Sequence, residues 1–287
     1  MPTEHEKLIG AHPLPDANII GSWLTSEDLD ILDSNPNKKH RKLSEKIAER
    51  SRAVEEIANW IVEHHVDANR LIRLQRRKSE IMSKYGISIE EYVDSQNLFP
   101  KLEVTKRGSA TEIILTQYLQ TTSGLSLLAY KLTYNANIDQ SMKGDDCLLF
   151  NTLDLRSKII VGEAKFRSTP SKKVVMDMIE NLEGNKKLPI SLPFIAQLFS
   201  SNGDEDMAGK IDDLLYEVSK GQIPIVNVGL LLSTKGTTKS SDSSLAVEAN
   251  LTTTNPNLVI ISLGTENPKA ILDDAFDLAK NILIEQI

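Results

Sequence analysis

The stretch GEAKF, residues 162–166, places Glu163 and Lys165 one residue apart at the end of an apolar run. Side chains alternate between the two faces of a strand, so this acid and this amine point the same way. They either form a simple ion pair on a half-exposed strand or hold something bound between them. A lone Glu-x-Lys pattern is common in proteins, so its meaning depends on what else the fold brings to this point.

A second acidic position precedes an apolar run earlier in the chain. Asp146 opens the run CLLF, and residues 147–162 are long enough for a strand, a turn and the next strand. A hairpin of that length would bring Asp146 and Glu163 together at one end of adjacent strands. With the carbonyl of Ala164, they would offer a divalent cation an all-oxygen shell, which suits Mg²⁺ or Mn²⁺. Asp145 is the alternative ligand, although an aspartate at this place is also typical of a turn.

At such a cation site, Lys165 would assist the attack of water on a phosphate group. Its ammonium would orient the attacking water, or stabilise the negative charge that develops as water attacks phosphorus. A lysine beside carboxylates keeps its proton unless burial dominates, and this favours charge stabilisation over a general-base role.

Glu112 is a further candidate, on a predicted helix over residues 109–120. It shares one helical face with Leu115 and Leu119, so it is expected to face inward and to assist at the cation site. The alternative is structural, because Ser109 and Glu112 also fit a capping box, in which the glutamate accepts a hydrogen bond from the Ser109 amide. The sequence leaves both interpretations open.

Positive charge is concentrated in a predicted helix over residues 68–86. Arg70, Arg73 and Arg77 share one helical face, which could follow a phosphate backbone. A solvated face or a docking face for an acidic partner fits the pattern equally well. Because the formal net charge of the chain is −7, any binding to nucleic acid must come from such local patches or from a partner.

The composition is that of an ordinary globular protein, with 40% hydrophobic and 25% charged residues among 287. No apolar stretch is long enough to span a membrane, and the N-terminus lacks a signal-peptide pattern. The single cysteine, Cys147, excludes an internal disulfide and a cysteine-rich zinc site, and it indicates a reducing cytoplasm. No GxxxxGK[ST] motif occurs, so any ATP-driven opening of DNA would belong to a partner.

Around these residues the sequence predicts an α/β fold with a central mixed sheet flanked by helices. Residues 1 to about 35 are loop-like, and helical spacing from about Lys42 predicts an α-helical region. We therefore expect an N-terminal arm and helical region over 1–95, followed by an α/β domain over 96–287. Residues 233–257, rich in Ser, Thr and Asn, are expected to form a mobile surface loop. The strands are expected at residues 125–134, 146–153, 158–167, 223–233 and 257–263.

An acidic residue, a strand-turn-strand and then Glu-x-Lys, in α-β-β-β-α order, resemble the PD-(D/E)xK nuclease superfamily. The resemblance implies that residues 96–287 form a restriction-endonuclease-like core in which Asp146 and Glu163 hold the metal. It also implies that Lys165 supports the nucleophilic water and that a helix glutamate, here Glu112, contributes. The proline of the motif is absent, since Asp145 precedes Asp146.

The stretches RGSATEIILTQYL, KGDD and VGEAKF, with the helix that follows them, are more closely similar to the nuclease subunit of the Hachiman anti-phage system. This resemblance covers roughly residues 100–185. It implies a Mg²⁺-dependent deoxyribonuclease of low sequence preference that works beside a superfamily 2 helicase. The alternatives are a stand-alone restriction or repair nuclease, and a nuclease-like scaffold that binds DNA or a partner without cutting.

Overall fold

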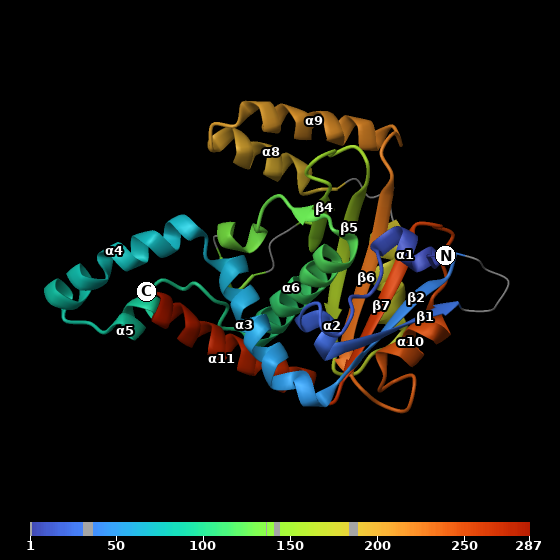
Figure 1. Cartoon of the computed structure of the whole chain (residues 1–287), viewed down its shortest axis with the longest axis horizontal. Coiled ribbons are helices and arrows are strands. Elements are labelled where there is room, and N and C mark those ends of the chain that lie inside the picture. Colours follow the sequence, from blue (N-terminus) through green and yellow to red (C-terminus); the bar gives the residue numbers. More distant parts are fainter. Residues whose placement is uncertain (1, 31–36, 136, 141–143, 184–188) are drawn as a thin grey trace.

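The computed structural model describes residues 2–30, 37–135, 137–140, 144–183 and 189–287. Among these residues seven strands form one sheet: β1 Leu24–Asp30, β2 Lys39–Glu45, β3 Ser126–Leu127, β4 Cys147–Phe150, β5 Ile159–Phe166, β6 Ile225–Thr234 and β7 Leu258–Thr265. Their order is β1-β2-β7-β6-β5-β4-β3 (Figure 1). β2, β7, β6 and β5 run parallel, while β1, β4 and β3 are antiparallel to their neighbours. The predicted α/β class with a mixed central sheet is therefore confirmed.

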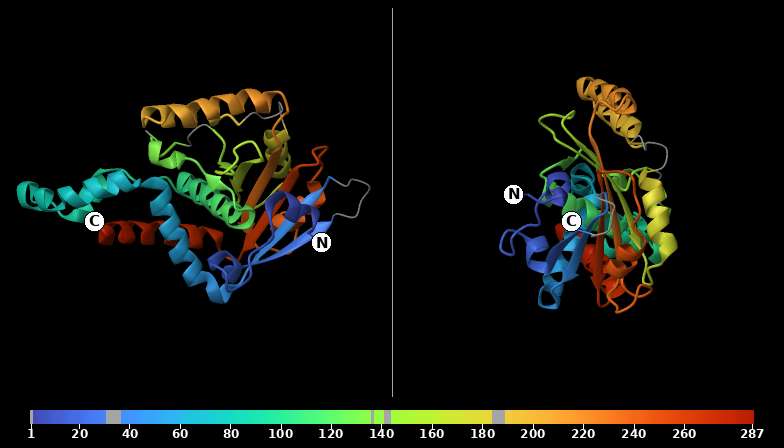
Figure 2. Two further views of the ribbon diagram at one scale, coloured as in Figure 1. Left: turned by 45° about the horizontal axis from the view of Figure 1, so that its top comes forward. Right: turned by 90° about the vertical axis from the view of Figure 1, so that its right-hand side faces the viewer.

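Helices cover both faces of this sheet (Figure 1, Figure 2). The helices of the described residues are α1 Glu4–Ile9, α2 Ile19–Trp23, α3 Arg50–His65, α4 Ala68–Tyr85, α5 Ile89–Ser95, α6 Glu103–Ser123, α7 Lys172–Glu183, α8 Leu192–Ser201, α9 Glu205–Ser219, α10 Ser243–Asn250 and α11 Pro268–Gln286, with short 3₁₀ helices η1 Ile47–Glu49 and η2 Lys131–Tyr134. α3, α6 and α11 share one hydrophobic core on the first face, and α7 and α10 share another on the second. None of the helices in the described segments is both long enough and apolar enough to cross a membrane.

Two glycines let these helices approach the sheet closely. A Cβ on Gly162 of β5 would lie 2.9 Å from Leu115 Cδ2 of α6, and one on Gly229 of β6 would lie 2.8 Å from Met178 Sδ of α7. Real Cβ atoms avoid contacts this short, so a larger residue at either position would force the helix side chain that it meets to shift. α6, which carries Glu112, therefore packs closely over β5.

The central strands carry few charged side chains because helices cover both of their faces. In β6 every position between the first and the last is buried. Parallel strands between two helical layers read as nearly continuous apolar runs for this reason. Glu163 interrupts the pattern, since it is only 6% exposed within β5. A buried carboxylate is costly unless it is paired, so the surroundings of Glu163 need a specific explanation.

The N-terminal third is less helical than the sequence predicts. β1 and β2 extend the sheet beyond β7, and α1 and α2 lie within the segment expected to be loop-like, of which residues 31–36 lie outside the described part. The helix expected from about Lys42 begins only at Arg50. The predicted start of the helix was wrong for two reasons. No Gly or Pro after Lys42 marks the place where β2 ends and α3 begins, and the pairing of β2 with β7 overrides the local helical spacing. The boundary after residue 95 stays a prediction.

Two later segments also differ from the prediction. Residues 125–134, expected to form a strand, contain only the two residues of β3 and the helix η2. The expected loop over 233–257 contains α10, whose Ala246 and Val247 are fully buried in the core beside α7. The polar composition of residues 233–257 suggested a loop, but a short helix such as α10 needs only a few apolar residues on one face to pack against the core.

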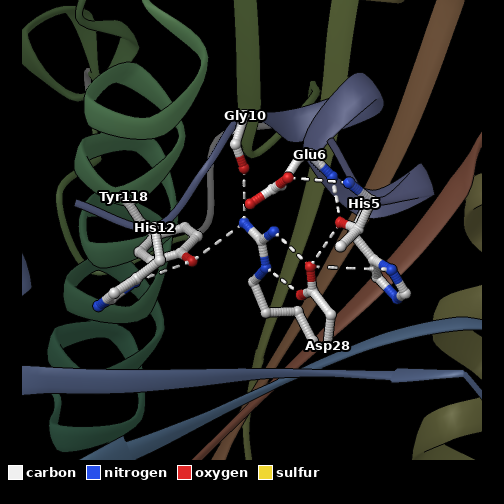
Figure 3. A network of polar contacts seen from close by, with 8 residues as sticks. His5, Glu6, Gly10, His12, Asp28 and Tyr118 are labelled. Atoms are coloured by element: carbon white, nitrogen blue, oxygen red, sulfur yellow. Dashed lines mark hydrogen bonds and ion pairs between the residues drawn. The ribbon is translucent and has the colours of Figure 1, made fainter. Parts of the chain in front are cut away.

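A buried ion-pair network joins the N-terminal segment to the sheet (Figure 3). Arg41 of β2 donates from Nε and Nη2 to the two carboxylate oxygens of Asp28 in β1, at 2.6 and 2.9 Å. Its Nη1 donates to the Gly10 carbonyl at 2.8 Å and to the Tyr118 hydroxyl at 3.4 Å. Bidentate pairs of this kind fix orientation as well as distance. The network therefore ties the outer strands to α6, the helix that carries Glu112.

We expect Arg41→Met to lower the free energy of unfolding by about 3 to 5 kcal/mol, because it leaves the Asp28 carboxylate without its cation. Arg107→Met is the matched control. It removes a more exposed bidentate pair with Asp273 and should cost about 1 kcal/mol or less. Urea unfolding followed by circular dichroism measures both variants, and equal losses for the two would contradict the anchoring role of Arg41.

Candidate functional site

The predicted acid and amine lie side by side near the end of β5. Lys165 Nζ is 2.6 Å from Glu163 Oε1, and Asn181 of α7 donates a hydrogen bond from Nδ2 to the same oxygen at 3.1 Å. The Lys165 side chain is 28% exposed, whereas that of Glu163 is 8% exposed. The amine is therefore the part of the pair that a substrate can reach. The sequence reasoning missed Asn181, whose only signal is its place on the helix directly after the motif.

Asp146 lies beside this strand end. The hairpin of β4 and β5 pairs Cys147 with Gly162, so the residue before the first lies next to the residue after the second. The Ala164 N–H donates a hydrogen bond to Asp146 Oδ2 at 2.8 Å. The structure thus brings the first acid into direct contact with the backbone between Glu163 and Lys165.

The two adjacent aspartates have different partners. The backbone N–H of Asp145 donates to Ser191 Oγ at 2.9 Å, and the backbone N–H of Ser191 donates to Asp145 Oδ2 at 3.0 Å. This reciprocal pair joins the start of β4 to the start of α8. Asp145 is thus held by a structural pair, whereas Asp146 faces the end of β5.

Glu112 reaches the site from the other face of the sheet, through Lys131. Its helix begins at Glu103, so Ser109 and Glu112 lie in the helix interior and form no capping box. Lys131 Nζ is 3.0 Å from Glu112 Oε2 and 3.5 Å from Asp146 Oδ1. The sequence reasoning missed Lys131, because its segment was expected to be a strand rather than the start of η2.

Burial and mutual repulsion perturb these carboxylates. Burial, with the nearby charge of Asp146, raises the pKa of Glu112 to about 7, even though Lys131 opposes the shift. Burial also raises the pKa of Asp146, while Lys131 lowers it and the charge of Glu163 raises it. Negative charge is therefore crowded at this end of β4 and β5, and such a site favours a bound cation.

The carboxylates of Glu112, Asp146 and Glu163 are the kind of ligand that a hard divalent cation binds, but in this structure they are not arranged around one point. Glu112 Oε2 is buried and lies 3.0 Å from Lys131 Nζ, so this oxygen already faces a positive charge. The carboxylates of Asp146 and Glu163 are oxygen donors of the kind that Mg²⁺ prefers. Among the residues that the structure describes, however, no three His, Cys, Asp or Glu side chains are grouped so that they could hold a metal ion. Lys131 and Lys165 instead supply the positive charge.

A small cavity lies behind this group. Its volume is about 30 Å³, and Glu112, Lys131, Asp146 and His64 are among the side chains that line it. Burial lowers the pKa of His64 to about 3, so this imidazole is neutral and adds no positive charge. The cavity has room for a water molecule or an ion, but not for a nucleotide.

Comparison with known proteins gives one consistent relationship. The family model described as HamA matches residues 18–279. The Hachiman protein HamA of Bacillus cereus is 39% identical over 283 residues, which covers 99% of this chain and 98% of that protein. The matched region includes α6, the β4–β5 hairpin and α7, which carry the candidate site. The chain belongs to the HamA family.

Proposed function

We propose that this protein is a Mg²⁺-dependent deoxyribonuclease of a Hachiman anti-phage defence system. The observation that carries the proposal is the hydrogen bond from the Ala164 N–H to Asp146 Oδ2, because it ties the first acid to the strand end that bears Glu163 and Lys165. Two acids and an amine at one strand end are the groups that cation-assisted hydrolysis of a phosphodiester uses. The 39% identity to the Hachiman protein HamA of Bacillus cereus supports the biological setting.

Asp146, Glu163 and the carbonyl of Ala164 are the groups that would hold Mg²⁺ or Mn²⁺, with Glu112 as an additional carboxylate. A bound divalent cation supplies a more acidic water and neutralises charge on the phosphate. Asn181 acts from outside the ligand set, since its hydrogen bond to Glu163 Oε1 fixes the direction of that carboxylate.

Lys165 brings a positive charge to the reacting phosphate. In the hydrolysis, the water oxygen bonds to phosphorus and gives up a proton to solvent, while the bond from phosphorus to the leaving sugar oxygen breaks and that oxygen takes up a proton from solvent. Negative charge builds up on the phosphate oxygens as this happens. The Lys165 ammonium lies 2.6 Å from Glu163 Oε1 and is partly exposed, so it is placed at the strand end where that charge builds up. A single preorganised donor of this kind contributes about 10²- to 10³-fold to the rate.

A nuclease-like scaffold that binds without cutting is the second candidate. Lys131 and Lys165 between them already form an ion pair with each of the three carboxylates, and this observation favours the scaffold. Plasmid DNA incubated with the purified chain, with and without its helicase partner, separates the two. Cleavage that needs Mg²⁺ or Mn²⁺ and stops with EDTA is expected of the nuclease. DNA binding without cleavage under either metal supports the scaffold.

We further propose that the protein works on DNA with a superfamily 2 helicase as partner, and that α4 is one DNA contact. α4 and α5 project from the body of the molecule beside the C-terminus (Figure 1, Figure 2). Only Leu74 and Ile81 of α4 are buried. Arg73 and Arg77 are exposed, whereas Arg70 is half-buried and donates to the Gln96 carbonyl at 3.4 Å.

The double variant Arg73→Gln/Arg77→Gln should weaken DNA binding uniformly across sequences. The slope of log affinity against log salt concentration should fall by about 2, because each lost phosphate contact removes about one released counterion. Lys210→Gln/Lys220→Gln, which removes two charges at α9, is the control. Fluorescence anisotropy with labelled duplex at several salt concentrations measures both, and an unchanged slope for the α4 variant would exclude this contact.

A further inference from the structure

Lys131 lies where the oxygens of the candidate site converge. Its Nζ is 3.0 Å from Glu112 Oε2 and 3.5 Å from Asp146 Oδ1, and it donates a hydrogen bond to the Asp145 carbonyl at 2.9 Å. The side chain is 15% exposed, as deeply buried as the two carboxylates that it contacts. Two carboxylates and a carbonyl thus surround the ammonium. These are the same kinds of oxygen that a hard divalent cation binds.

Contacts on both sides hold Lys131 in this position. Lys131 is the first residue of η2, and the residue before it, Tyr130, donates a hydrogen bond from its hydroxyl to Glu63 of α3. At the other end of η2, the Tyr134 ring packs edge-on against Phe194 of α8, with ring centroids 5.8 Å apart. These contacts hold the backbone of η2, so the Lys131 side chain starts from a fixed point beside the two carboxylates.

One ammonium and one divalent cation cannot both occupy these oxygens. Like charges about 4 Å apart repel strongly in a partly buried site, where water screens them poorly. Lys131 offers a single charge to Glu112 and Asp146, whereas a divalent cation would balance both carboxylates. The lysine stem carries a compact point charge on a flexible chain, so its head can move aside while the backbone stays in place.

We propose that Lys131 is a built-in counter-ion of the cation site, which competes with Mg²⁺ or Mn²⁺ for Glu112 and Asp146 and withdraws when the cation binds. The inference rests on the proposed function, because it takes these carboxylates as part of a cation site. Lys131 is a positioning residue here, since it contacts the ligand side chains. It sets the free cation concentration at which the site fills.

The test is Mn²⁺ binding to the full-length chain, measured without DNA by the electron paramagnetic resonance signal of free Mn²⁺. Lys131→Met should bind Mn²⁺ about tenfold or more tightly than the parent, because a competing positive charge is gone. Lys280→Met is the matched control. It removes one charge from an exposed pair with Asp94 and should leave the affinity unchanged. Lys131→Gln is measured in parallel, in case the methionine variant does not fold.

Asp146→Asn in the parent and in Lys131→Met identifies the site that the Mn²⁺ occupies. Tighter binding in the Lys131 variants that is lost with Asp146→Asn supports the inference. Equal or weaker binding in folded Lys131 variants, with Asp146-dependent binding in the parent, overturns the inference and leaves the proposed function standing. Binding that does not depend on Asp146, or no binding by any variant, overturns both.

Discussion

Lys165→Ala is expected to abolish DNA cleavage, with a loss of at least about 10²- to 10³-fold in rate. Lys165 places a partly exposed ammonium 2.6 Å from Glu163, and alanine removes this charge from the strand end at which negative charge builds up on the phosphate. Fold and partner binding should be retained, because the side chain is 28% exposed at the end of β5 and packs little apolar surface. Plasmid nicking with Mg²⁺ under initial-rate conditions measures the effect.

Lys172→Ala is the control for this prediction. Lys172 is the first residue of α7 and is exposed, so its loss removes the same charge close to the site without touching Glu163. Nicking by the control should stay near the parental rate. If purified Lys165→Ala nicks plasmid at the parental rate, the assigned role of Lys165 is wrong.

Asp146→Asn and Asp145→Ala should separate chemistry from stability. Asp146→Asn is expected to lower cleavage by about 10²-fold or more, since even groups outside the ligand set of a metal site commonly cost 10- to 100-fold. Its free energy of unfolding should change little, because asparagine keeps an oxygen for the Ala164 N–H. Plasmid cleavage and urea unfolding are measured on the same preparations.

Asp145→Ala is expected to show the opposite pattern. It removes the acceptor for the Ser191 N–H, so it should lower the free energy of unfolding by about 1 to 3 kcal/mol while the folded protein still cleaves DNA. The two adjacent acids thus serve as controls for each other. Loss of cleavage in Asp145→Ala together with normal cleavage in Asp146→Asn would move the ligand to Asp145.

The parts of the site that depend on local chain geometry could be predicted from the sequence. The alternation of strand side chains put Glu163 and Lys165 together, and the length of the segment between Asp146 and Glu163 fitted a hairpin that the structure contains. The mixed α/β fold followed from the alternation of helical and strand patterns after Pro100. The catalytic role of Lys165 and the ligand roles of Asp146 and Glu163 remain predictions, which the variants and the crystal experiment test.

The remaining features depend on contacts between distant segments. Lys131 reaches Glu112 and Asp146 only because residues 131–134 turn as a 3₁₀ helix, whereas their apolar character suggested a strand. The outer strand β2 joins the sheet by pairing with β7, more than two hundred residues along the chain, and β1 is added by pairing with β2. The difference between Asp145 and Asp146 is set by Ser191, which no local pattern links to either.

The central claim is that Asp146 and the end of β5 hold one divalent cation between them. A crystal of the full-length chain grown with Mn²⁺ and measured for anomalous scattering tests this most directly. We predict one peak within about 2.0 to 2.5 Å of carboxylate oxygens of Asp146 and Glu163 and of the Ala164 carbonyl. A well-ordered site without a peak at saturating Mn²⁺, or a peak bound only by other residues, would contradict the claim.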